Sequence, residues 1–251
     1  MLNCICIKWG KKYTTEDVNR LFRAVSRETI QQVRFFCMTD DRTGLSPGIE
    51  FLPLVEEPHE KRMMAAQERF PRKGALKKIA LFRPDLVPDL DGPLLALDLD
   101  IVVVGDLHDL AEFSPGFVCM RRPFHILYHH TLGEGSVIKF EPQKHAALYE
   151  GMARNPEASV LLGEGSEQSY TSLTAAKNGY FVNFPDRWIA SFKRDCVRLP
   201  PLNLFRRPLF PAGAKAICFY GKPSIQEAID GYNFGPVNRS PPCDWIKAYW
   251  K

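Results

Sequence analysis

The stretch "LLALDLDIVVVG", Leu94 to Gly105, places two aspartates, Asp98 and Asp100, inside an otherwise apolar run. An apolar, β-branched segment of this length predicts a strand that is buried on both faces in a parallel sheet. A carboxylate is costly to bury unless it is paired, hydrogen-bonded or bound to a metal. Because residues i and i+2 of a strand share a face, we expect the two carboxylates to point the same way.

Two carboxylates on one face make a partial ligand set for a hard cation. Mg²⁺ and Mn²⁺ take oxygen ligands and are usually shared with substrate phosphates. The structural alternative is that one aspartate caps the following turn while the other pairs with an arginine, and a D-x-D pattern alone does not decide between them. A second chemical alternative is a haloacid-dehalogenase-type phosphatase, to whose nucleophile motif "ALDLDIV" is locally similar. Such enzymes carry an acidic pair on a later strand, whereas Asp40–Asp41 precedes the motif here.

The rest of the chain alternates strand and helix signals, which predicts an α/β fold with right-handed crossovers. Thr14 is placed to cap the first helix, with Asp17 three residues on, as in a capping box. Ligands of open α/β sheets bind outside the carboxyl ends of the strands, which puts residues 8–10, 40–41 and 98–100 on one rim. Strands are expected at 3–7, 33–40, 49–54, 94–103, 116–122 and 136–140, and helices at 14–27, 77–83, 145–154 and 167–178, followed by long ordered loops.

Composition is that of an ordinary globular protein, with 45% hydrophobic and 25% charged residues in 251. The net charge of +4 is concentrated late, because residues 171–251 carry twelve Lys/Arg against five Asp/Glu. Such a surplus favours contact with phosphates, acidic sugars or a membrane surface, or it is a solvated basic face. The seven cysteines lie mostly in apolar runs, which indicates reduced, buried thiols. With no transmembrane run and no leader pattern, we expect a soluble, cytoplasmic protein.

Several motifs around the D-x-D, taken in order, resemble one family. "LDLDIVVVGDLHDL" is similar to the D-x-D region of glycosyltransferases with the nucleotide-diphospho-sugar (GT-A) fold, especially family 8 and its uncharacterised bacterial relatives. "KKIALFRPDL", "GSVIKF", "GSEQSYTSL" and "ICFYGKP" resemble further motifs of that family, and nearly the whole chain is covered. The resemblance implies a single GT-A domain over 1–251, with a Rossmann-like, mostly parallel sheet flanked by helices. Residues 1–105 would bind the nucleotide-sugar and 106–251 the acceptor.

The resemblance also implies a donor site. Asp98 would contact the sugar or ribose as well as the metal, and Asp100 would bind the metal. Gln168 would lie beneath the anomeric carbon as a catalytic residue, with Glu167 on the hydroxyls of the donor sugar. Without the family, Glu167, Gln168 and Lys78 look like ordinary helix-surface residues. The remaining donor-binding residues implied are Ile7, Lys8 and Tyr13 for the nucleotide, Lys78 for a phosphate or the donor sugar, and Lys222 for the diphosphate.

The implied cofactor is Mn²⁺ or Mg²⁺ and the implied donor a UDP-sugar, transferred with retention of configuration. An inverting enzyme would instead need a carboxylate base beside the acceptor hydroxyl, for which Glu164 or Glu167 could serve. From charge alone, the basic, aromatic C-terminal third would suit an acidic glycan or a lipid-linked acceptor, with peripheral membrane contact. No nucleic-acid recognition motif is present, so nucleic acid is not an expected partner.

Three departures from the family pattern leave a non-catalytic relative open. Tyr220 stands where family 8 commonly supplies a His as third metal ligand, and a phenol with a pKa near 10 is a poor ligand at neutral pH. Glu167 replaces an Asp, and Gly135 stands in place of an Asn. The histidines of "FHILYHH", at 125, 129 and 130, have no matching metal motif and are expected in a loop that shapes the acceptor pocket.

Overall fold

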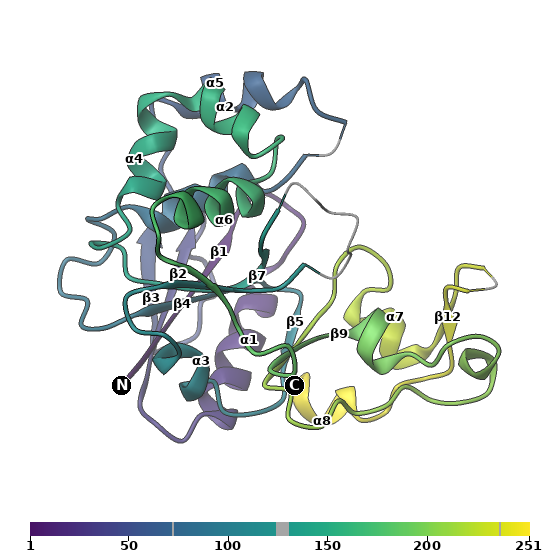
Figure 1. The fold of residues 1–251 in the computed structure, drawn as a ribbon. Helices are drawn as coiled ribbons and strands as arrows, with labels where there is room; N and C mark the ends of the chain where they lie inside the picture. Colours follow the sequence, from purple (N-terminus) through teal and green to yellow (C-terminus); the bar gives the residue numbers. More distant parts are fainter. Residues whose placement is uncertain (72, 124–130, 236) are drawn as a thin grey trace.

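A seven-stranded sheet forms the centre of the protein, which a computed structural model describes at residues 1–71, 73–123, 131–235 and 237–251. The strand order is β3-β2-β1-β4-β7-β6-β8 (Figure 1). Strands β1 to β4 run parallel to one another, whereas β7 runs antiparallel to β4 and β6. The predicted mixed α/β class with a mostly parallel sheet is confirmed. The strands are β1 (Leu2–Lys8), β2 (Val33–Thr39), β3 (Ile49–Pro53), β4 (Leu94–Leu97), β6 (Val118–Arg121), β7 (Glu134–Phe140) and β8 (Phe181–Asn183).

Helices cover both faces of this sheet because its inner strands are apolar on both sides. Every residue of β1 is buried, and all seven cysteines are free and buried, as predicted. The helices α1 (Thr15–Glu28) and α3 (His108–Glu112) pack on one face. The other face is covered by α2 (Glu60–Gln67), α4 (Ala147–Arg154), α5 (Pro156–Leu162), α6 (Glu167–Lys177) and the 3₁₀ helix η1 (Leu76–Phe82) (Figure 1).

Local signals set the helix ends as predicted in two places. The Thr14 side chain accepts a hydrogen bond from the backbone N–H of Asp17, whose carboxylate accepts one from the N–H of Thr14 in return. This capping box fixes the start of α1 after β1. The segment before Pro84 is helical as expected, but it is the 3₁₀ helix η1 and ends at Phe82. Proline disfavours helical geometry in the residue before it, which accounts for the stop.

The predicted strand over 94–103 is wrong as a single strand. It is divided into β4 and β5 (Ile101–Val103). Strand β5 belongs to a second sheet, in which it pairs with β10 (Ala216–Cys218), and β10 pairs with β9 (Ile189–Ser191). The N–H of Asp98 still donates to the Ser136 carbonyl of β7, whereas the carbonyl of Asp100 accepts from Phe219 beyond β10, each at 2.9 Å. The two aspartates therefore lie at the crossing between two sheets and not on one strand face.

The C-terminal third is more structured than the predicted long loops. It contributes a third apolar cluster that includes Phe192, Phe219 and Ile246. Strands from both sides of residue 105 share each of the two sheets, with β4 beside β7 and β5 beside β10, and the division into functional halves stays a prediction. No helix of the described residues is long and apolar enough to span a membrane. The elements are β9 (Ile189–Ser191), the π-helix η2 (Phe192–Cys196), the 3₁₀ helix η3 (Leu202–Leu204), β10 (Ala216–Cys218), α7 (Ile225–Asp230), β11 (Tyr232–Asn233), β12 (Arg239–Ser240) and α8 (Ile246–Tyr249).

Candidate active site

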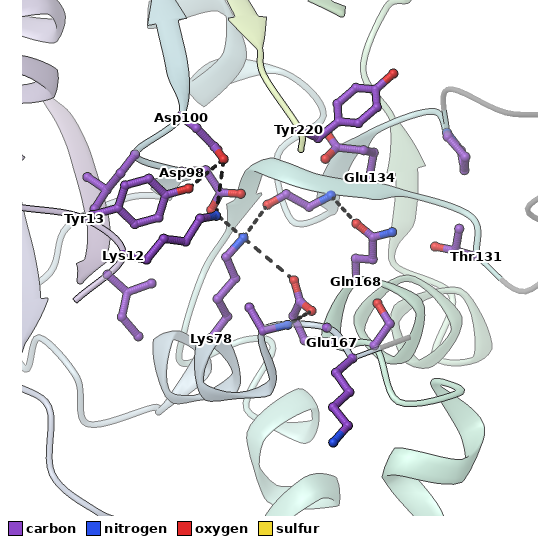
Figure 2. Close-up of a pocket in the computed structure, with 18 of the residues that line it drawn as sticks. Lys12, Tyr13, Lys78, Asp98, Asp100, Thr131, Glu134, Glu167, Gln168 and Tyr220 are labelled. Atoms are coloured by element: carbon purple, nitrogen blue, oxygen red, sulfur yellow. Dashed lines mark hydrogen bonds and ion pairs between the residues drawn. The ribbon is translucent and has the colours of Figure 1, made fainter. Parts of the chain in front are cut away.

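A pocket of about 570 Å³ opens where β1 and β4 end and β7 and α6 begin. This is the carboxyl-end rim of the parallel strands, where the sequence predicts the ligand site. Asp98 and Asp100 both line the pocket, together with Lys78 of η1 and with Glu167 and Gln168 of α6 (Figure 2). With Ile7 and Tyr13, which also line the pocket, the structure brings together seven of the nine predicted site residues, although they span 161 positions of the chain.

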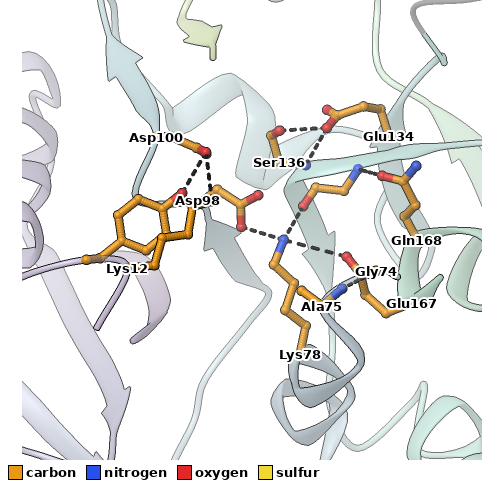
Figure 3. A network of polar contacts seen from close by, with 12 residues as sticks. Lys12, Gly74, Ala75, Lys78, Asp98, Asp100, Glu134, Ser136, Glu167 and Gln168 are labelled. Carbon is orange, nitrogen blue, oxygen red and sulfur yellow. Dashed lines mark hydrogen bonds and ion pairs between the residues drawn. The ribbon is translucent and has the colours of Figure 1, made fainter. Parts of the chain in front are cut away.

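Lys78 is the centre of a buried charge network. Its ammonium group forms an ion pair with Asp98, lies 3.8 Å from Oε1 of Glu167, and donates to the Gly135 carbonyl at 3.1 Å (Figure 3). Only 8% of Lys78 is exposed. Burial alone would lower the pKa of Lys78, but the carboxylates of Asp98 and Glu167 outweigh it and raise that pKa. Lys78 therefore stays a cation inside the protein.

Burial shifts the pKa of Asp98 in the opposite direction, because it raises the pKa of a carboxyl group. The Lys78 ammonium opposes this shift, and the neighbouring Asp100 adds to it. The ion pair with Lys78 is thus what keeps a carboxylate at this depth. Any added positive charge beside Asp98 and Asp100 would stabilise both further.

Asp100 is as exposed as Asp98, but its partners are more exposed than Lys78. The Tyr13 hydroxyl donates to its Oδ2 at 2.6 Å, and the ammonium of Lys12 lies 3.7 Å from the same oxygen. Lys12 is 74% exposed, so this ion pair is a surface one. Burial and the nearby carboxylates raise the pKa of Tyr13, which keeps the phenol protonated as a donor. Tyr13 lines the pocket, but its hydroxyl is held by Asp100.

The first turn of α6 is fixed to its surroundings by both of its predicted functional residues. Oε2 of Glu167 accepts from the backbone N–H of Ala75 at 2.9 Å, and Oε1 of Gln168 accepts from the N–H of Gly135 at 3.2 Å. Glu167 is 5% exposed. These residues are therefore not helix-surface residues, which is how they look without the family resemblance.

Glu134, at the start of β7, is a pocket residue that sequence reasoning missed. Its Oε1 accepts from the Ser136 hydroxyl at 2.6 Å and from the Ser136 N–H at 3.2 Å (Figure 3). Its Oε2 is buried and has no hydrogen-bond partner among the described residues. Burial raises the pKa of Glu134, and the bonds from Ser136 and the charge of Lys78 only partly oppose it. The available signal was a glutamate between Gly133 and Gly135, directly before the motif "GSVIKF".

Tyr220 also lines the pocket, at the position where the family supplies a histidine. The Ser191 hydroxyl lies 3.0 Å from the Tyr220 hydroxyl, and the Lys193 ammonium lies 4.8 Å from the centre of its ring. Among the described residues there is no group of three or more His, Cys, Asp or Glu side chains placed to hold a metal. Asp98 and Asp100 supply two hard oxygen ligands that suit Mn²⁺ or Mg²⁺, and the others would have to come from phosphate and water.

Other predicted residues lie outside the pocket lining. Lys222 is 68% exposed, and its ammonium lies 2.8 Å from Glu227. Lys8 is buried and does not line the pocket, whereas its neighbours Ile7 and Trp9 do. Asp40 accepts from the N–H of Gly10 and ties the ends of β1 and β2 together. The histidines at 125, 129 and 130 lie outside the described residues.

The sequence matches no protein-family model and no curated protein sequence. The structure, however, is similar to solved glycosyltransferases. Galactosyltransferase LgtC, solved with donor and acceptor sugar analogues, shares 12% identity over 89% of each chain, with a TM-score of 0.61. The glycosyltransferase GlyE of Streptococcus pneumoniae shares 14% identity over all of this chain and 60% of its own, with a TM-score of 0.62. Mouse xyloside xylosyltransferase 1 shares 11% identity over 87% of this chain and 97% of its own, with a TM-score of 0.54. The chain therefore has the GT-A fold that the sequence resemblance predicts.

Proposed function

We propose that this protein is a glycosyltransferase that moves a sugar from a nucleoside diphosphate, most simply UDP, to a glycan or lipid-linked acceptor. The observation that carries the proposal is the buried Lys78, placed between Asp98 and Glu167 at the carboxyl edge of a GT-A sheet. An apolar ligand would not need a buried network of charges. A nucleotide-sugar fits such a network, because its transfer leaves an anionic diphosphate behind.

The reaction separates charge, and the pocket carries groups for both ends. Positive charge develops at the anomeric carbon, and negative charge accumulates on the departing diphosphate. Asp98 and Asp100 would hold Mn²⁺ or Mg²⁺, which supplies Lewis-acid stabilisation of that diphosphate when bound. Lys78 keeps Asp98 ionised and adds positive potential, and the exposed Lys12 is free to turn from Asp100 toward phosphate.

Gln168 and Glu167 would act on the sugar. The Gly135 N–H orients Gln168 by bonding its oxygen, and we place the amide beneath the anomeric carbon, where it steadies the developing cation. Retention of configuration follows from this placement. Glu167 is engaged by Ala75 and Lys78, which suits the binding of sugar hydroxyls better than proton abstraction from an acceptor.

One experiment separates this proposal from its alternatives. Thermal stabilisation by UDP is measured with and without Mn²⁺, and UDP release is then followed from a panel of UDP-sugars. We expect tighter UDP binding with metal and slow hydrolysis of one cognate donor. UDP binding without release from any donor would favour a non-catalytic relative. Cleavage of a generic phosphomonoester without UDP binding would favour the phosphatase.

A further inference from the structure

A loop over residues 199–210 exposes an unusual amount of apolar surface. Leu199 is 81% exposed and Phe205 78%. The other exposed apolar side chains of this 199–210 loop are Leu202, Leu209 and Phe210. Single exposed apolar residues are normal, but several within twelve positions mark a surface that contacts something else.

The loop is held in place, so its side chains are presented by a fixed backbone. The N–H of Leu209 donates to the Cys196 carbonyl at 2.8 Å and closes the loop at its base. Asn203 is only 1% exposed and donates to the Arg239 carbonyl at 3.3 Å. The indole N–H of Trp245 donates to the Pro208 carbonyl at 3.3 Å. The loop thus has a buried polar base and an apolar outer edge.

Cations surround this apolar edge. Residues 193–215 contain six Lys/Arg and one acidic residue, Asp195. The exposed Arg206 side chain forms no hydrogen bond or ion pair with another described residue, and Arg207 pairs with Asp244. Exposed apolar side chains beside the unpaired cation Arg206 are complementary to an anionic lipid surface, which offers acyl chains below a layer of negative head groups.

The loop is also linked to the pocket. The π-helix η2 directly precedes it and contributes Arg194 to the pocket lining. In Figure 1 the C-terminal region with α8 and β12 lies to one side of the central sheet, away from the layer of α4 and α6. A flat surface against this region would leave α4 and α6 uncovered, with Arg194 between that surface and the pocket.

We infer that the 199–210 loop docks the protein on an anionic membrane surface, so that a lipid-linked acceptor enters the pocket past Arg194. Leu199 and Phe205 insert at the level of the head groups, and Arg206 binds lipid phosphates. The route of the acceptor rests on the proposed function, whereas the docking itself does not.

The test measures co-sedimentation with vesicles of phosphatidylcholine alone and with 30% phosphatidylglycerol added, at low and high salt. We expect binding only to the anionic vesicles, weakened by salt. The double variant Leu199→Ser/Phe205→Ser should bind at least tenfold more weakly. Arg206→Gln should bind roughly fivefold more weakly, from the loss of one cation near the surface.

Ile30→Ser is the matched control, because Ile30 is 92% exposed in the turn between α1 and β2. It should leave vesicle binding unchanged, and all variants should keep the wild-type melting temperature and its shift by UDP. Equal binding of the wild type and the double variant would overturn the inference. The inference would also be overturned if the double variant had a lower mass than the wild type by light scattering but unchanged vesicle binding, because the loop would then mediate self-association. If UDP does not shift the melting temperature of the wild type, the proposed function is overturned, whereas vesicle binding still tests the role of the loop.

Discussion

The two sides of the pocket are built in different ways. The inner side is formed by Lys78 and Glu167, whose side chains are 10% and 7% exposed, and by Asp98, whose side chain is 25% exposed. The outer side, formed by Lys12, Tyr13 and Asp100, depends on a lysine that is 74% exposed. Exposed ion pairs contribute little to stability, whereas an unpaired buried charge costs much. The inner side should therefore be needed for folding and the outer side for ligand binding.

Lys78→Met should give the largest effect. It leaves the buried Glu167 and the partly buried Asp98 without their cation and removes the donor to the Gly135 carbonyl. We expect a loss of about 3–5 kcal/mol in the free energy of unfolding, measured with urea. Lys12→Met is the matched control on the outer side and should cost less than about 1 kcal/mol. Equal losses in the two variants would contradict the comparison.

Gln168→Glu should change catalysis with little change in stability. The new side chain keeps an oxygen that accepts from the Gly135 N–H, so the start of α6 should remain in place. It places a carboxylate where the neutral amide would face the anomeric carbon. We expect the rate of sugar transfer to fall roughly 100-fold, as when one positioned group of an active site is lost. UDP affinity by calorimetry should stay within about twofold, and a parallel loss of UDP affinity would contradict the assignment.

Asp100→Asn should affect metal-dependent binding alone. The amide oxygen can still accept from Tyr13, so the fold should be unaffected, but one metal-binding charge is gone. We expect UDP affinity in Mn²⁺ to fall about tenfold or more, with metal-free affinity unchanged. Intact metal-dependent binding would refute the outer side as the metal site. Tyr220→His is the converse change, and tighter Mn²⁺ binding would support its place as the third ligand.

Glu134→Gln should give the smallest effect and one with a distinct pH dependence. Burial raises the folded-state pKa of Glu134, so the unfolded chain loses this proton at a lower pH than the folded protein does. Wild-type stability is therefore penalised as pH rises above about 4.3, the ordinary pKa of glutamate. The variant lacks that titration. Relative to wild type it should gain stability between pH 4 and pH 7 in thermal unfolding, and a constant difference across that range would contradict the buried, proton-binding state.

Local sequence signals predicted the elements of the first half well. Thr14 and Asp17 are close in sequence and form their capping box independently of the rest of the fold. The apolar runs of β1 and β2 are long enough to identify strands, and the strand-end rule then located the pocket. Such features depend on residues that are neighbours in the chain or on a general property of parallel sheets.

Features that depend on distant partners were not predictable in the same way. The run from Leu94 to Val103 is apolar apart from Asp98 and Asp100, and it has no Gly or Pro to mark the point at which its hydrogen bonds pass from β7 to β10. The family motif suggested Lys222 for the diphosphate, yet its side chain pairs with Glu227. Glu134 matters because it is buried near Lys78, and the spacing of residues in the sequence does not reveal that position.

The crossing of the chain between the two sheets has a mechanical consequence. Asp98 is tied through its backbone to β7 of the first sheet, and Asp100 through its own to the residue that follows β10 of the second. Leu99 is the single residue between them. A ligand bound by both carboxylates would therefore connect one sheet to the other. Binding of such a ligand would then restrict the movement of the two sheets relative to each other at residues 98–100.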